Sequence, residues 1–225
     1  QLSTSGYKSN VTGFSLGTDF EYLDDLRFGI STKNIIEKIT VDTKASLKQK
    51  KQEGNYFDNF LGMDFNYDKR NQKFETTSGF FSNYSVDIPI LSDTNTLMNS
   101  YNYKIFKELY EDNVSTLSFL ISSSTSISGD NVKLSERLYI PARKLRGFEA
   151  GKVGPKDGSD YVGGNYITAI NATSTIPRIL ENIQNIDIVM FADVGNIWGV
   201  DYNSSLETDE IRSSVGLGID WLTQI

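Results

Sequence analysis

Apolar and polar positions alternate along most of this chain. At residues 211–221 the odd positions include Val215, Leu217 and Ile219, whereas the even positions hold only polar residues and glycine. Because successive side chains of a β-strand point to opposite faces, this period predicts strands with one apolar and one polar face. Alternation of this kind predicts about ten strands, at residues 11–20, 26–34, 39–49, 60–68, 80–90, 99–109, 114–125, 162–174, 186–196 and 211–221. A helical period fits almost nowhere, and only residues 45–53, rich in lysine and glutamine, could form a helical turn.

Two architectures are compatible with strands of this kind. A soluble sandwich packs its apolar faces together and uses strands of about 5–6 residues. A membrane barrel turns its apolar faces to lipid and its polar faces to a lumen, with strands of about 9–11 residues. The predicted strands are mostly about 9–12 residues long, with aromatic residues such as Tyr22, Tyr103 and Trp198 near their ends. These features favour an all-β fold, a transmembrane antiparallel β-barrel, with residues 1–225 as a single domain.

Composition excludes several classes of function. The 225 residues carry a net charge of −7 and contain no cysteine and no histidine. Disulfides, thiol catalysis, histidine-based triads and histidine metal sites are therefore excluded within this chain. The acidic balance, without a block of basic residues, argues against nucleic acid as a partner. No run of about 18 apolar residues predicts a transmembrane helix.

One connection is much longer than the others. Residues 127–161 show little strand character, and a loop of that length in a compact fold is usually functional. It contains Arg146, Gly147 and Phe148, then Gly154 and Pro155, and it is followed by Gly163, Gly164 and Asn165. Further along, the alternation at 186–196 turns Asp193 to the polar face. On the residues alone, Arg146 is either a solvated loop residue or a partner for such a carboxylate.

These motifs resemble those of the BamA family of outer-membrane β-barrel assembly factors. Residues 145–148 with Gly154-Pro155 and residues 163–165 resemble the family's long sixth extracellular loop. Upstream, Tyr67, Asp68, Arg70 and Gly79 resemble its strand–turn–strand signature, and residues 191–198 resemble its later strand with an inward aspartate. The resemblance implies that the loop folds into the lumen and that Arg146 pairs with Asp193, with Gly147 and Phe148 against the wall. Asp68 and Arg70 form either a pair that pins their turn or ordinary polar residues at the membrane interface.

One position departs from the family pattern. Thr173 stands where the family often carries a second acidic residue near the arginine. Arg146 is therefore expected to have one carboxylate partner rather than two, and we expect a looser attachment of the loop.

The resemblance also implies a function and a setting. The chain would supply about ten strands of a sixteen-stranded barrel, without the family's periplasmic modules and without its last strands. The whole protein would fold and insert β-barrel proteins in the outer membrane of a Gram-negative bacterium, with no enzymatic step, cofactor or metal. Its partners would be unfolded outer-membrane proteins, outer-membrane lipid and lipoproteins of an assembly complex. The alternatives are a TamA-like or two-partner secretion translocase, a passive outer-membrane channel, and a soluble sandwich enzyme or lectin.

Overall fold

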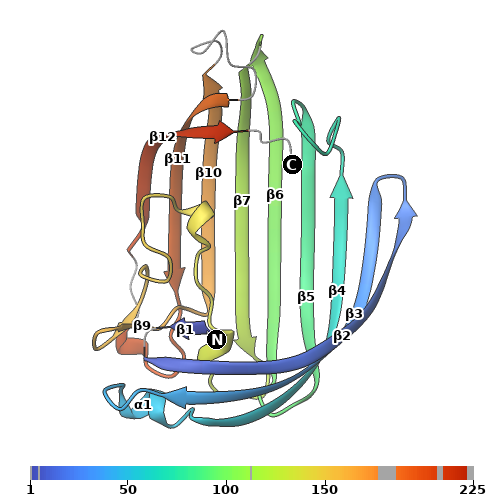
Figure 1. Ribbon diagram of the computed structural model, residues 1–225. Coiled ribbons are helices and arrows are strands. Elements are labelled where there is room, and N and C mark those ends of the chain that lie inside the picture. Colours follow the sequence, from blue (N-terminus) through green and yellow to red (C-terminus); the bar gives the residue numbers. More distant parts are fainter. Residues whose placement is uncertain (1, 5, 112, 177–185, 207–209, 222–225) are drawn as a thin grey trace.

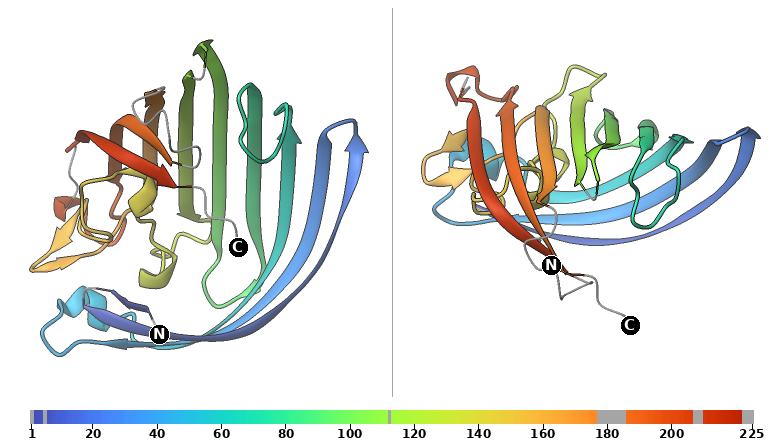
Figure 2. Two further views of the ribbon diagram at one scale, coloured as in Figure 1. Left: turned by 45° about the horizontal axis from the view of Figure 1, so that its top comes forward. Right: turned by 90° about the horizontal axis from the view of Figure 1, so that it is seen from above.

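Ten strands form one antiparallel sheet in this computed structural model, which describes residues 2–4, 6–111, 113–176, 186–206 and 210–221. Each strand pairs with its neighbour in sequence, except that β7 pairs with β10 across the long connection. The sheet curves into an open trough (Figures 1 and 2). The elements are β1 (Leu2–Thr4), β2 (Tyr7–Leu23), β3 (Leu26–Val41), α1 (Leu47–Lys50), β4 (Gly54–Asp68), β5 (Gly79–Ser92), β6 (Thr96–Tyr110), β7 (Asn113–Ser126), η1 (Leu134–Glu136), η2 (Ala142–Lys144), β8 (Lys156–Asp157), β9 (Asp160–Tyr161), β10 (Tyr166–Ile176), β11 (Ile186–Trp198), η3 (Ser204–Leu206) and β12 (Arg212–Trp221).

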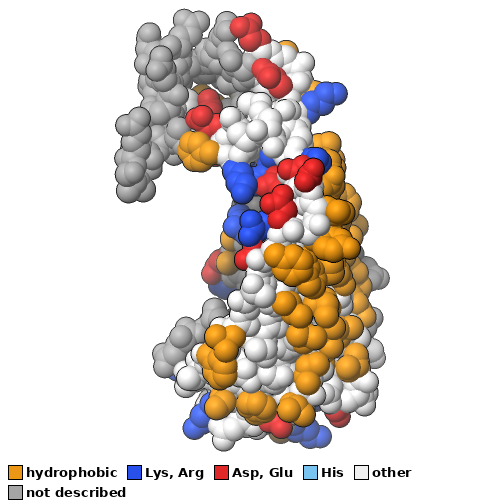
Figure 3. Space-filling view, turned by 90° about the vertical axis from the view of Figure 1, so that its right-hand side faces the viewer, with side chains coloured by type: hydrophobic (Ala, Val, Ile, Leu, Met, Phe, Trp, Pro, Cys, Tyr) orange, Lys and Arg blue, Asp and Glu red, His pale blue; other side chains and the backbone are white. Residues whose placement is uncertain are grey.

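The outer face of the sheet is apolar and open to its surroundings. Val215, Leu217 and Ile219 on β12 are 83%, 71% and 70% exposed. An aromatic row crosses four strands, from Phe20 through Phe28 and Phe65 to Tyr84, with adjacent ring centroids 4.9–6.3 Å apart. Figure 3 shows hydrophobic side chains gathered over the strands on one side of the molecule. Exposed apolar strands of this kind suit a lipid bilayer. The described strands form one ten-stranded sheet, and not the two packed sheets of a sandwich.

The inner face carries polar side chains that bind one another across the strands. Lys33 donates to Asp87 at 2.6 Å, and Asn83 donates to Asp64 at 2.9 Å. The predicted two-faced alternation is therefore confirmed, with the polar set turned toward the trough. Within the described residues, no helix has the length and apolar character needed to span a membrane.

The predicted division of residues 26–49 into two strands is wrong. The predicted strands at 26–34 and 39–49 are in reality one strand, β3, which ends at Val41 and is followed by α1. Ser46 begins α1 with a capping box, in which its side chain accepts from the backbone N–H of Gln49 while Gln49 accepts from the backbone of Ser46. This local pairing satisfies backbone groups that a strand would leave to a neighbour, so the helical turn expected within 45–53 forms.

The long connection is structured rather than open. It extends to Asn165, because β10 begins only at Tyr166, and it contains η1, η2 and the β8–β9 hairpin. One buried apolar cluster lies between this loop and the inner wall, formed by Leu120, Ile140, Leu145, Val153, Ile167, Ala169 and Ile197. This buried apolar cluster therefore joins the loop to the sheet.

Candidate functional site

The side chain of Arg146 lies against Asp193 on the inner wall. Its Nε donates to Oδ2 of Asp193 at 2.8 Å and its Nη2 donates to Oδ1 at 2.7 Å, while its backbone N–H donates to Oδ2 at 2.9 Å. The guanidinium therefore binds the carboxylate through two parallel hydrogen bonds, a geometry that lysine cannot reproduce. The Asp193 side chain is fully buried and that of Arg146 is 30% exposed. This contact attaches the middle of the long loop to β11.

Three further residues complete this arrangement. Asn171, opposite Asp193 in the β10–β11 register, donates to Asp193 at 3.0 Å and to the carbonyl of Lys144 at 2.7 Å. Thr173 accepts a hydrogen bond from Nη2 of Arg146 at 3.2 Å, so a hydroxyl occupies the place expected for a second acid. The ring centroid of Phe191 lies 3.8 Å from the guanidinium carbon of Arg146. Sequence reasoning missed Asn171 and Phe191, although Phe191 lies two residues before Asp193 on β11 and therefore points to the same inner face, and Asn171 lies opposite Asp193 on β10.

Apolar side chains seat the loop beside this polar contact. Leu145 is buried in the cluster between loop and wall, and Phe148 packs against the same cluster. Gly147, between Arg146 and Phe148, has a φ of +85°, which glycine adopts without strain. This turn lets the side chains on either side of Gly147 reach the wall.

The glycines later in the loop lie where backbone and wall come very close. A Cβ on Gly154, whose φ is +100°, would lie 2.9 Å from Cβ of Ile197. A Cβ on Gly164 would lie 2.4 Å from the carbonyl oxygen of Trp198. Pro155 is buried, and Gly163 has a φ of +65°. Gly154 and Gly164 are therefore required by close packing, beyond any role in turns.

Asn165 belongs to a second polar cluster, at the base of the loop. Its Oδ1 accepts from Arg137 at 3.0 Å, and its Nδ2 donates to Asp201 at 3.1 Å. Arg137, whose side chain is fully buried, pairs with Asp201 and lies over the Tyr202 ring at 4.7 Å. The sequence offered no signal for this pair beyond the presence of Arg137 in the long loop.

The residues of the strand–turn–strand signature lie on β4, β5 and the turn between them, several strands away from β10 and β11 in the sheet order. Arg70 donates to both carboxylate oxygens of Asp68, at 2.8 and 2.7 Å, where β4 enters its turn. Tyr67 packs on Phe80 on the outer face, with ring centroids 5.5 Å apart. Gly79 begins β5 with a φ of +97°. This group shapes the turn between β4 and β5, and Arg70 also lines the inner-face cavity that Arg146 borders.

A cavity of about 1290 Å³ lies on the inner face beside the Arg146 contact. It is lined by both cationic and acidic side chains, including Lys104, Lys144, Asp187 and Asp220. In the described residues, no group of three or more His, Cys, Asp or Glu side chains is arranged to hold a metal ion. The geometry is therefore that of a braced, polar lumen.

Comparisons with known proteins agree with this architecture. The Omp85 superfamily domain matches residues 2–225. The outer membrane protein assembly factor BamA of Neorickettsia risticii (strain Illinois) is 25% identical, over 96% of this chain and 30% of that protein. The chain therefore spans less than a third of this relative.

Solved structures share the fold at low sequence identity. The crystal structure of BamA from Haemophilus ducreyi lacking POTRA domains 1–3 superposes with a TM-score of 0.85 and 18% identity, over 97% of this chain and 49% of that one. CdiB from Acinetobacter baumannii superposes with a TM-score of 0.57 and 14% identity, over 96% of this chain and 37% of that one. These superpositions confirm the expected fold of a partial β-barrel. The family match and the relative of Neorickettsia risticii confirm the expected resemblance and the place in the outer membrane. The chain belongs to the Omp85 superfamily.

Proposed function

We propose that this chain is the braced wall of an outer-membrane protein assembly factor, which folds and inserts β-barrel proteins without enzymatic chemistry. The observation that carries the proposal is the attachment of the long loop to the inner wall through Arg146 and Asp193. The overall likeness to BamA, the assembly factor named above, supports it. We propose unfolded outer-membrane proteins as substrates, lipid around the outer face, and lipoproteins of an assembly complex as further partners.

The residues of this chain act by keeping the long loop and the barrel wall in a fixed arrangement. Arg146 fixes the loop to β11, and the apolar cluster with Phe148 keeps the loop pressed on β7, β10 and β11. A loop held at a charged and an apolar contact stiffens that part of the barrel, so that any seam that opens for a substrate lies elsewhere in the whole protein. Asp68 and Arg70 stabilise a turn at the other end of the strands.

The test uses the whole purified protein in lipid vesicles. A urea-denatured outer-membrane protein is added, and its folding is followed by the band that resists SDS until heated. We expect vesicles with the protein to fold this substrate faster than empty vesicles, and R146A to slow the reaction. The control is R143A, because Arg143 is a neighbouring exposed arginine with no ion pair among the described residues. No acceleration over empty vesicles would contradict the proposed function, and equal rates for R146A and R143A would contradict the role of the brace.

A translocase of the same superfamily is the second candidate. The superfamily match supports it, because that match covers the chain without separating the branches. A translocase would move one secreted partner across vesicles and leave the folding of other barrel proteins unchanged. A passive channel would instead conduct ions steadily in a planar bilayer.

A further inference from the structure

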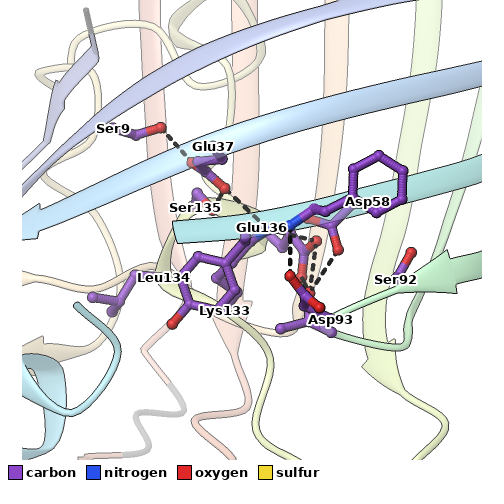
Figure 4. A network of polar contacts seen from close by, with 12 residues as sticks. Ser9, Glu37, Asp58, Ser92, Asp93, Lys133, Leu134, Ser135 and Glu136 are labelled. Atoms are coloured by element: carbon purple, nitrogen blue, oxygen red, sulfur yellow. Dashed lines mark hydrogen bonds and ion pairs between the residues drawn. The ribbon is translucent and has the colours of Figure 1, made fainter. Parts of the chain in front are cut away.

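A third polar cluster, separate from the Arg146 contact and from the Arg137–Asp201 pair, surrounds Lys133 at the start of the long loop (Figure 4). The Nζ of Lys133 lies 2.6 Å from Asp58, 3.0 Å from Glu37 and 3.3 Å from Glu136. It also lies 5.0 Å from the ring centroid of Tyr56. One ammonium group is thus enclosed by three carboxylates and an aromatic ring.

All four charged side chains in this cluster are buried. Lys133 is 3% exposed, and Glu37, Asp58 and Glu136 are 4%, 1% and 8% exposed. Burial alone would lower the pKa of Lys133, but the surrounding carboxylates, Glu136 foremost, raise it above its usual value, so the ammonium keeps its charge. If Lys133 is removed, three buried carboxylates face one another with no cation. Breaking a buried ion pair in this way is strongly destabilising.

The partners of Lys133 come from the opposite side of the trough. Glu37 lies on β3 and Asp58 on β4, whereas Lys133 follows β7, three or more strands away in the sheet. In Figure 1 the ends of β2 and β3 sweep beneath the other strands toward α1 and β9. The cluster therefore joins two parts of the sheet across its open side.

The residues next to Lys133 also bind the opposite side of the trough. The backbone N–H of Leu134 donates to Gln52 at 2.8 Å, and the hydroxyl of Tyr7 donates to the carbonyl of Leu134 at 2.9 Å. The hydroxyl of Ser135 donates to Glu37 at 2.8 Å. Each of these bonds joins residues 134–135 to β2, β3 or the segment after α1. Lys133 is therefore the charged centre of a continuous row of contacts between the loop and these strands.

We propose that Lys133 is a positioning residue, which latches the base of the long loop to β3 and β4 and so keeps this end of the barrel closed. Its ion-pair partners on the wall are Glu37 and Asp58, and its partner within the loop is Glu136. The latch is independent of the Arg146 contact, which binds the loop to β11. The inference does not rest on the proposed function, because closure is measured without any substrate.

The first experiment measures ion conductance of the whole protein in planar bilayers. We expect K133Q to raise the ratio of open to closed states by about a hundredfold or more, since an unpaired buried cluster is left behind. The control is K152Q, which removes a loop lysine that is paired with Glu149 at the surface. Folding of each variant is checked by its compact, heat-sensitive mobility in SDS. A folded K133Q that conducts like the wild type, or a K152Q that opens equally, would overturn the latch.

A chemical rescue separates charge from general damage. The chain contains no cysteine, so K133C provides a single thiol within it. Treatment with bromoethylamine in urea, before refolding, creates a close analogue of lysine, whereas iodoacetamide creates a neutral side chain. We expect the first product to be closed and the second open, and equal behaviour of the two products would overturn the proposal.

A partner variant covers the case in which K133Q does not fold. D58N leaves Lys133 with two carboxylates, and we expect it to fold and to open more often than the wild type but less than a protein without the cation. Wild-type conductance in folded D58N would overturn the role of Asp58 as an ion-pair partner of Lys133.

Discussion

Replacing Asp193 by asparagine is the sharpest test of the contact that holds the long loop. The carboxylate accepts four hydrogen bonds, three from Arg146 and one from Asn171, at 2.7–3.0 Å. Asparagine has nearly the same shape, but one of its two terminal groups is a donor. In D193N a buried N–H group therefore faces another donor, and the guanidinium loses its counter-charge.

The size of the effect follows from burial. Hydrogen bonds to charged groups contribute about 1.5–3 kcal/mol each, and loss of one partner of a buried ion pair costs about 3–5 kcal/mol. Because the Arg146 side chain is 30% exposed, solvent replaces part of what is lost. We therefore expect the lower end of that range, about 3 kcal/mol. At about 1.4 kcal/mol for each tenfold change, this is roughly a 150-fold rise in the detached population of the loop.

Hydrogen exchange of the whole protein measures this population directly. The backbone N–H of Arg146 donates to Asp193, so peptides from residues 139–153 should lose protection by roughly two orders of magnitude in D193N. The control is D64N, which alters another inner-face carboxylate, one bound to Asn83 and remote from the loop. Unchanged protection in D193N, or equal loss in D64N, would refute the reasoning.

Three further outcomes are expected. In G154A the new Cβ meets Ile197 at 2.9 Å in a backbone of φ +100°, so the urea midpoint should fall by the equivalent of about 1–3 kcal/mol. Burial raises the pKa of Glu136 in the folded protein. Its contribution to the free energy of unfolding is therefore complete below the ordinary carboxyl pKa and is lost as the pH rises through the raised value. The melting temperature should decline over this pH window, and E136Q should flatten the decline. L217R places a charge on the outer face and should lower stability in lipid by about 2–4 kcal/mol.

Each of these has an internal comparison. G151A shares a positive φ, +74°, but its Cβ would meet nothing within 4 Å, so a loss equal to that of G154A would contradict the packing argument. T116R points into the polar cavity, and a cost equal to that of L217R would contradict the assignment of the faces. An unchanged pH slope in E136Q would assign the decline to other groups.

The predicted faces of the strands agree with the structure because lipid and lumen each impose one type of side chain. This constraint acts on every second residue of a strand, so the alternation can be recognised in one sequence without related sequences. The error at 39–49 arose because the capping box at Ser46 is local chemistry that competes with alternation. The Lys133 cluster was missed for the opposite reason, since Glu37, Asp58 and Lys133 are far apart in sequence and each resembles an ordinary polar residue. Asn171 was missed because its pairing partner is known only once the register is known.

The strand order has a consequence for how the chain reaches this structure. Nearly every pairing in the sheet joins consecutive strands, so each hairpin closes a short loop at a small cost in chain entropy. The exceptions are the β7–β10 pairing and the contacts of residues 133–135, which reach from 75 to 127 positions back along the chain. Contacts at such separation form slowly relative to local ones. We expect the sheet to grow hairpin by hairpin, with the long loop as the last element to take its place.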